Sequence, residues 1–415
     1  MFIGLAYKSL LNRKGSVLLT VLALTVSIFV LLAVEHIRHQ AKDSFSNTVS
    51  GVDLVVGART GSLNLLLYSV FRVGSPTNNI SWDSYQTIAS GKNVAWAVPI
   101  SLGDSYQGYR VMGTTRDYFK YFSYGQKHQL KFTSGKAFEG VFDVVLGFEV
   151  AKQLKHTLGD KVILAHGIAS TSFSLHDDRP FKVVGILAPT GTPVDQTVHV
   201  SLQGIEAIHM GWRQGVKMPG ATLSAEQLAQ MAFQPKSITA FMLGLKSRIT
   251  TFRVQREINT YKREPMLAIL PGVALSELWQ MMGMFENTLR LISVFILIAA
   301  LLGLSAMLLA SIRERQREIQ LLRVVGAPPF FLFLLVELEA LLVAVVSILL
   351  GASMLYMSLS IVGDVLVSNF GLHISTNIVS KSNVLVLFWM ICSTVIVAAI
   401  PSLGAYKSAR SRQME

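Results

Sequence analysis

The sequence predicts an α-helical membrane domain of four spans joined to a mixed α+β domain outside the membrane. Of the 415 residues, 51% are hydrophobic and 15% are charged, whereas a soluble chain carries about 25% charged residues. One long apolar run lies near the N-terminus and three lie near the C-terminus. The segment between the first and second runs is rich in glycine, serine and threonine, so we expect the α+β domain to be inserted between spans 1 and 2.

Four segments are apolar enough to cross a bilayer as helices of about 20 residues. They are residues 16–34, 291–309, 330–350 and 384–403, and the third run can be extended to residue 359. The first follows Arg13 and Lys14, as the apolar part of a signal peptide would. Its run is long, however, and no small-residue cleavage site follows it, so we expect an uncleaved anchor.

The short loops predict the orientation, because lysine and arginine gather on the cytoplasmic side of a membrane. Basic residues lie before span 1, between spans 2 and 3, and after span 4: Lys8, Arg13, Lys14, Arg313, Arg315, Arg317, Arg323, Lys407, Arg410 and Arg412. The loop of residues 361–383 carries one lysine and no arginine. We therefore expect an inner-membrane protein with both termini in the cytoplasm and the large domain in the periplasm.

Charge and cysteine content argue against a nucleic-acid-binding protein and against a disulfide-stabilised one. The formal net charge is +12, but many basic residues lie at the edges of the apolar runs, where lipid headgroups explain them better than nucleic acid does. The single cysteine, Cys392, lies within an apolar run, so a disulfide framework within the chain is excluded.

The segment between spans 1 and 2 contains both strand-like and helical stretches. The strand-like runs include residues 52–56, 94–100, 144–146, 181–187 and 198–201, and the helical ones include 149–154 and 251–262. This mixture is typical of an α+β fold, which we expect as two subdomains. We place the N-terminal elbow helix and span 1 at residues 1–37, the periplasmic domain at 38–288, and spans 2–4 with the cytoplasmic loop and tail at 289–415.

The loop between spans 2 and 3 has the pattern of a short amphipathic helix. Arg313 and Arg317 lie four residues apart and share a face, while Ile319 and Leu322 lie near a common apolar stripe. Gly326 occupies a favoured position for ending a helix, and two prolines follow it. Such a helix can dock into a groove of a soluble ATPase, although a solvated helix at the membrane surface would show the same charge pattern.

The same loop resembles a family signature. Residues 315–327 read RQREIQLLRVVGA, which is similar to the R-x-R-E-I-G-L-L-R-A-x-G-A signature of MacB/FtsX-type ABC transporter permeases, a group that includes the lipoprotein-release permeases. In span 3, residues 339–342 read EALL and resemble the family's E-A-x-L. Pro401 and Ala405 match its terminal P-x-x-x-A spacing, but the Asp-Pro that often follows is absent.

The periplasmic segment is similar to the MacB-like periplasmic core domain. The matching stretches are residues 111–113, 118–119, 135–138, 145–147, 159–160 and 181–187. Together with the loop signature, the resemblance covers nearly the whole chain.

The resemblance implies a non-catalytic permease subunit that needs no cofactor of its own. ATP and magnesium would be bound by a partner ABC ATPase, and the chain lacks both a G-x-x-x-x-G-K-[ST] phosphate loop and a G-x-S-x-G nucleophile motif. We expect a homodimer with two ATPase copies and coupling residues Arg313, Arg315, Arg317, Glu318, Ile319, Leu322, Arg323 and Gly326. A periplasmic or lipid-anchored partner is compatible with this assembly.

Other functions stay open at this point. An FtsX-like regulator of periplasmic enzymes would use the same motion, although its periplasmic domain is usually much smaller. A sensor or receptor would bind no ATPase at the loop, and a membrane-anchored hydrolase would need the nucleophile motif that is missing. Lipoproteins, amphipathic peptides, haem, macrolides and metal complexes are all compatible substrates.

Two groups of polar residues stand out as candidate sites. Glu337 and Glu339 lie inside the apolar run of span 3, where carboxylates default to a functional role. Hydrogen bonding to another helix explains them as well. His176, Asp177 and Asp178 are weak candidates for metal ligands, with His166 and His199 nearby in sequence. Zinc needs three or four converging groups, and no tight ligand spacing occurs here, so we expect no metal site.

Overall fold

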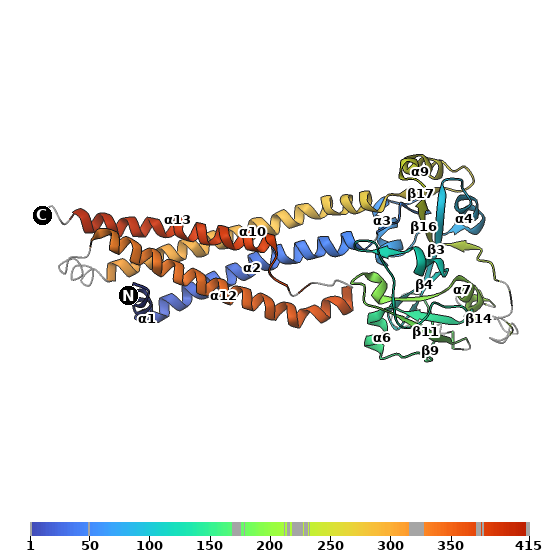
Figure 1. The fold of residues 1–415 in the computed structure, drawn as a ribbon, viewed down its shortest axis with the longest axis horizontal. Coiled ribbons are helices and arrows are strands. Elements are labelled where there is room, and N and C mark those ends of the chain that lie inside the picture. The colour runs from blue at the N-terminus through green and yellow to red at the C-terminus, as the bar shows by residue number, and fades with distance from the viewer. Residues whose placement is uncertain are drawn as a thin grey trace. The chain divides into compact units, whose positions relative to one another are not determined.

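The computed structural model describes the chain in two compact units (Figure 1). The described residues are 2–48, 50–167, 176–177, 179–210, 212–213, 216–217, 227, 231, 233–314, 328–370, 375 and 377–411. The first unit, here called the bundle, comprises Met1–Gln40, Met282–Asp364 and Ile374–Glu415. The second unit, here called the sheet domain, comprises Ala41–Met281 and Val365–His373.

In the described part of the chain, four helices are long and apolar enough to cross a membrane. They are α2 (Lys14–Asn47), α10 (Pro271–Glu314), α12 (Pro329–Phe370) and α13 (Lys381–Ser411), and a shorter helix, α1 (Phe2–Leu11), precedes them. The predicted four-span architecture is confirmed. Helix α12 continues beyond the span predicted at 330–350, and also beyond its extension to 359, because apolar length marks where a helix can cross a bilayer and not where the helix ends.

Within the bundle, α2 and α12 pack closely at a glycine. A Cβ atom at Gly351 would lie 2.8 Å from Cγ2 of Ile28, so no larger side chain fits there without a shift. Nearby, the hydroxyl of Ser347 hydrogen-bonds to the Val21 carbonyl at 3.3 Å. Small residues that let two backbones approach are a usual means of helix association in membranes, where lipid removes the hydrophobic driving force.

The sheet domain is built on one mixed sheet. The described strands follow the order β17-β1-β16-β3-β4-β12-β8-β11-β7, with β10 paired to β3 and β9 to β11. Their bounds are β17 (Met266–Ile269), β1 (Leu54–Ala58), β16 (Ala240–Leu245), β3 (Val94–Tyr106), β4 (Tyr109–Thr114), β12 (Thr197–Ser201), β8 (Asp143–Leu146), β11 (Phe181–Leu187), β7 (Phe132–Gly135), β10 (Ala165–His166) and β9 (Lys161–Val162). Pairs β4–β12 and β8–β11 are parallel and the other pairs are antiparallel.

The mixed α+β class is confirmed, but one sheet runs through the domain where two subdomains were expected. The reason is long-range pairing, since β16 and β17 come from the end of the domain and pair with β1 at its start. Helices flank the sheet: α4 (Trp82–Ala89), α6 (Phe148–Leu154), α7 (Leu202–His209) and α9 (Thr251–Asn259). Strands β1 and β12 are buried at every residue, as expected for strands covered on both faces.

His199 in β12, a residue of the core, is expected to make the stability of the folded chain sensitive to acid. Its ring is fully buried and lies 5.5 Å from the ring of Tyr118. Burial lowers the pKa of His199 to about 3, and the positive charge of Arg72 adds to the shift. The unfolded chain takes up the proton below about pH 6.5, whereas the folded chain stays neutral until about pH 3. The stability from neutral His199 is therefore complete above pH 6.5 and is lost as the pH falls through that window.

Replacing His199 by leucine is expected to weaken this acid sensitivity. Between pH 7 and pH 5, the wild-type free energy of unfolding should fall by about 2 kcal/mol more than that of His199→Leu, from about 1.4 kcal/mol per pH unit for one group. Denaturant titration of the full chain in detergent, followed by tryptophan fluorescence, measures both. Parallel pH profiles for the two proteins would contradict the prediction.

Candidate functional site

The end of α10 that precedes the predicted coupling loop is held by the turn after α1. Arg13 donates a hydrogen bond from Nη2 to the Ser311 carbonyl at 2.8 Å. Its Nε also lies 3.3 Å from Oε2 of Glu314, the last residue of α10. Because Arg13 is mostly buried and Glu314 is exposed, the hydrogen bond to the backbone carries more of this contact than the ion pair does.

Most of the predicted coupling residues lie outside the described residues. Arg313 is exposed in the last turn of α10. The residues beyond the described part are Arg315, Arg317, Glu318, Ile319, Leu322, Arg323 and Gly326. The structure therefore places the start of the loop, at Glu314, and its return at Pro329.

The intramembrane carboxylates Glu337 and Glu339 are both buried within α12. The hydroxyl of Ser9 in α1 donates to Oε1 of Glu339 at 2.5 Å. This hydrogen bond ties α1 to α12, as Arg13 ties the same N-terminal region to α10. Residues 2–13 therefore hydrogen-bond both to α10, which leads into the coupling loop, and to α12, which follows it.

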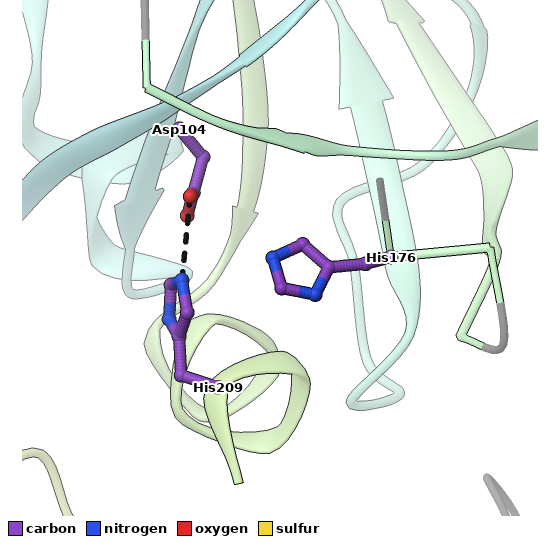
Figure 2. A group of neighbouring side chains, drawn as sticks. All are labelled: Asp104, His176 and His209. Carbon is purple, nitrogen blue, oxygen red and sulfur yellow. Dashed lines mark ion pairs between the residues drawn. The ribbon is translucent and has the colours of Figure 1, made fainter. Parts of the chain in front are cut away.

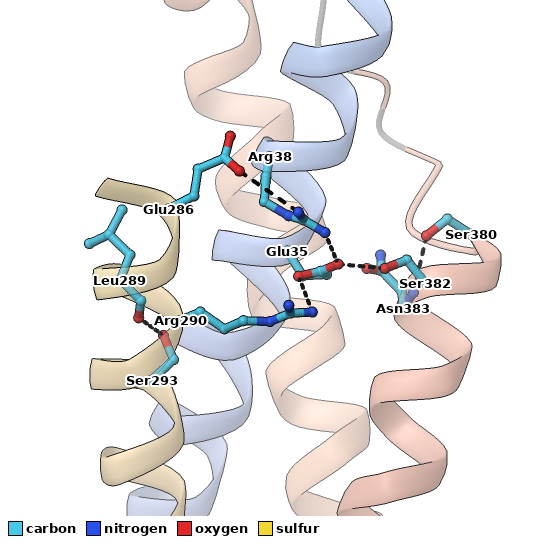
Figure 3. A network of polar contacts seen from close by, with 9 residues as sticks. All are labelled: Glu35, Arg38, Glu286, Leu289, Arg290, Ser293, Ser380, Ser382 and Asn383. Atoms are coloured by element: carbon cyan, nitrogen blue, oxygen red, sulfur yellow. Dashed lines mark hydrogen bonds and ion pairs between the residues drawn. The ribbon is translucent and has the colours of Figure 1, made fainter. Parts of the chain in front are cut away.

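A second polar cluster joins α2, α10 and α13, as Figure 3 shows. Its centre is the buried carboxylate of Glu35 in α2. Oε1 accepts hydrogen bonds from Arg38 at 2.8 Å and from the Ser382 hydroxyl at 2.7 Å, and Oε2 lies 3.4 Å from Nη2 of Arg290 in α10. Arg38 also approaches Glu286 of α10 at 3.7 Å. We call these five residues the Glu35 network.

His36 extends the contact between α2 and the start of α13. Its ring is buried, with Nε2 2.8 Å from the Ser375 carbonyl and Nδ1 3.3 Å from Nδ2 of Asn383. The same Asn383 amide donates to the Ile378 carbonyl at 2.7 Å. The sequence analysis did not identify this site, because Glu35, His36 and Arg38 directly follow the predicted span 1 and read as its polar end. The signal was available, because Arg290, Ser382 and Asn383 lie at predicted span ends on the same side.

The sheet domain contains a cavity of about 430 Å³ beside α4 and α7. Trp82 and Gln86 line it from α4, and Leu202 and Gln203 line it from α7. Arg116 and Glu139, which lie 3.4 Å apart, bring charge to the same cavity. Its size is within the range of small-molecule sites.

Of the residues named as weak metal candidates, the structure describes His176 and Asp177. His176 is buried beside Asp104 and His209, two residues far from it in sequence. Asp177 is exposed, and Asp178 lies outside the described residues. His199 packs on aromatic rings in the core and does not belong to this group.

Four long apolar helices and a large domain inserted after the first define a multi-pass membrane protein. Residues 17–261, more than half of the chain, match the family model of the MacB-like periplasmic core domain, and residues 290–409 match that of the FtsX-like permease C-terminal domain. The chain therefore belongs to the FtsX-like ABC transporter permeases with a MacB-like periplasmic core domain. Permeases of this family are membrane components that work with an ABC ATPase.

Comparison with solved structures adds two distant similarities. The periplasmic region of MacB from Actinobacillus actinomycetemcomitans is 10% identical, with 56% of this chain and 94% of that chain covered at a TM-score of 0.35. The extracellular domain of the noncanonic ABC-type transporter YknZ from Gram-positive bacteria is 12% identical, with 52% and 98% covered at a TM-score of 0.30. Both scores are low, so the family assignment depends on the two family models. The comparison with curated proteins gave no match.

Proposed function

We propose that this chain is the permease subunit of an ABC transporter in which a separate ATPase drives a conformational change of the periplasmic domain. The observation that carries the proposal is the length of α10, which has 44 residues between Pro271 in the sheet domain and Glu314 at the coupling loop. At 1.5 Å per residue this helix is about 66 Å long, whereas the hydrocarbon core of a bilayer is about 30 Å thick. One helix therefore has the length to carry motion from the loop into the periplasmic domain.

The contacts of the bundle support transmission of force. Arg13 and Ser9 brace the two helices that flank the loop, so a push on the loop reaches α1, α10 and α12 together. At another point along the helices, the Glu35 network links α2 and α10 to α13. Ion pairs and hydrogen bonds of this kind can hold one packing arrangement and re-form in another, as in other shifts between packed helices.

The assembly we propose is a homodimer of this chain with two ATPase subunits, which bind the ATP and magnesium. Both termini lie in the cytoplasm of a cell with an inner membrane, and the sheet domain lies in the periplasm, because the basic loops favour that orientation. The work done is export of a periplasmic substrate or extraction of a lipid-anchored one. This chain supplies the moving parts and no catalytic residue.

Removing charge from the coupling loop is expected to release the ATPase. After purification in mild detergent, the double variant Arg317→Ala, Glu318→Ala should retain at most about a tenth of the ATPase that wild type retains. A tenfold weaker association corresponds to a loss of about 1.4 kcal/mol at the interface. Mass spectrometry of the co-purified subunit and its ATP hydrolysis rate are the two measurements.

A matched control is available in the sheet domain. Arg256 and Glu257 are adjacent, exposed residues of α9, so Arg256→Ala, Glu257→Ala removes the same two charges away from the loop. This control should retain the ATPase in full. If wild type co-purifies with no ATPase, the chain acts as a sensor or scaffold. If both double variants lose the ATPase equally, the loss is not specific to the loop and the coupling assignment fails.

A further inference from the structure

Three side chains from separate parts of the sheet domain meet at one point, as Figure 2 shows. Asp104 belongs to β3, His209 is the last residue of α7, and His176 precedes β11. Their ligand atoms all lie within 4.8 Å of one another. Oδ1 of Asp104 is 3.3 Å from Nε2 of His209. The rings of His176 and His209 are nearly perpendicular, with their centroids 5.3 Å apart.

A break in the strand pairing positions Asp104. The register of β3 against β4 shifts between Leu102 and Ser105, so Asp104 lies in an irregular part of the ladder. Such irregularities turn side chains out of the regular alternation and are common at functional sites. The carboxylate is almost completely buried, and a carboxylate is retained in such a place only with a partner of opposite charge or a metal ion.

A buried arginine holds His176 against the end of α7. Arg179 is only 1% exposed, and its backbone N–H donates to the His176 carbonyl at 3.1 Å. Its Nη1 lies 2.6, 3.0 and 2.8 Å from the carbonyls of Ala207, Ile208 and Met210, which surround His209. The last carbonyls of a helix have no partner within the helix, so Arg179 both satisfies them and fixes the two histidines relative to each other.

The contacts of His209 are those of a metal-binding histidine. Its Nε2 faces the Asp104 carboxylate, and the ring also hydrogen-bonds to the Ile205 backbone. A hydrogen bond that one ring N–H donates to a backbone carbonyl orients the ring and leaves the other nitrogen to bind the metal.

We propose that Asp104, His176 and His209 form a binding site for a divalent transition metal of the Zn²⁺ class. Two imidazole nitrogens and a carboxylate oxygen are ligands that zinc uses, whereas calcium and magnesium select oxygen. Zinc bonds of about 2.0–2.2 Å place tetrahedral ligands about 3.3 Å apart. The Asp104–His209 pair already has this spacing. Because all three ligand atoms lie within 4.8 Å of one another, a shift of His176 by at most about 1.5 Å completes the set.

The group is accessible from the surface at His209. The side chain of His209 is 31% exposed, while Asp104 and His176 are buried, so the group opens to the surface at His209. Three protein ligands leave one tetrahedral position for water or for a donor atom of a molecule bound at that surface. The proposal is independent of ATPase coupling, because all three ligands belong to the sheet domain.

The test measures Zn²⁺ binding to the full chain in detergent, purified with an affinity tag that contains no histidine and stripped with a chelator. Titration against a chromophoric chelator gives the affinity and stoichiometry, and Co²⁺ absorption reports tetrahedral coordination. Wild type should bind one equivalent. His209→Gln and Asp104→Asn should each weaken binding by at least about 100-fold and remove the Co²⁺ bands, since losing even a hydrogen-bond partner of a metal ligand costs 10–100-fold.

His156 supplies a matched control. Its Nδ1 lies 3.3 Å from Oδ2 of Asp160, the same kind of pair at the same distance. In the described part of the chain, no third histidine, cysteine or acidic group joins this pair. His156→Gln should therefore leave the affinity unchanged. His176→Gln should weaken binding like the other ligand variants, with its fold checked by circular dichroism.

Asp104→Asn and His209→Gln test the metal site even if His176→Gln does not fold. Asp104→Asn keeps the shape of the side chain, and His209 is partly exposed, so neither change should disrupt the domain. A wild-type chain that takes up no Zn²⁺, or ligand variants that bind as tightly as wild type, would overturn the proposal. Equal loss in His156→Gln would show that histidines in general bind the metal, which overturns it too.

Discussion

Replacing Arg179 by methionine is expected to lower the free energy of unfolding of the sheet domain by about 4 kcal/mol. The guanidinium is buried and hydrogen-bonds three carbonyls at the end of α7, those of Ala207, Ile208 and Met210. Methionine fills similar volume but donates nothing, so the buried carbonyls of Ala207 and Ile208 and the partly buried carbonyl of Met210 lose this partner. Each buried group left unsatisfied costs about 1–3 kcal/mol, and partial access to water at the helix end keeps the sum near the lower part of that range.

Denaturant titration of the full chain, followed by tryptophan fluorescence, measures this loss. Arg253→Met on α9 is the control, because Arg253 is exposed and surface substitutions usually change stability by less than about 0.5 kcal/mol. A loss below about 1 kcal/mol in Arg179→Met would mean that water or another donor replaces the guanidinium. The same variant should bind Zn²⁺ more weakly, since His176 loses its anchor to α7.

Removing the two arginines of the Glu35 network should destabilise the bundle more than neutralising its central carboxylate does. Removing both bases by Arg38→Met, Arg290→Met is expected to destabilise the bundle by about 3–5 kcal/mol, the cost of leaving a buried charge without its ion pairs. In the described part of the chain, Ser382 then remains as the partner of the Glu35 carboxylate. Glu35→Gln alone should cost less, because Arg38 and Arg290 are partly exposed and can be hydrated.

Combining the changes tests whether the charge is the cause. Glu35→Gln added to the double arginine variant removes the uncompensated charge, so the triple variant should recover most of the lost stability, a coupling that a mutant cycle isolates. Unfolding of the full chain in mixed micelles, followed by helical circular dichroism, supplies the free energies. Lys381→Met, an exposed change beside Ser382, is the control. A triple variant less stable than the double variant would contradict the prediction.

The membrane architecture could be predicted because it depends on local pattern. The length of an apolar run compares directly with bilayer thickness, and all four predicted spans lie within the long helices of the structure. Several strands of the sheet domain were also predicted close to their observed bounds, as for residues 181–187. Their order was not, because alternating hydrophobicity shows which face of a strand is buried and not which strand lies beside it.

For the candidate sites, the local sequence identified single residues, whereas their partners depend on how distant segments pack. Glu337 and Glu339 were selected from sequence because a carboxylate in an apolar run is visible locally. The partner of Glu339, Ser9, could not be predicted, because it belongs to a helix that only packing brings to α12. Likewise, His176 was named with its neighbours in sequence, Asp177 and Asp178, while the residues that converge on it are Asp104 and His209.

The sequence by itself determined the class of protein, its four spans and its family, since hydrophobic length and the loop motif are properties of neighbouring residues. The tertiary structure alone decided which distant side chains meet: Glu35 with Arg290 and Ser382 in the bundle, and Asp104 with His176 and His209 in the sheet domain. The physical reason is that such contacts depend on which helix faces and strand edges pack together. That choice is made by the free energy of the whole fold and not by any local stretch of chain.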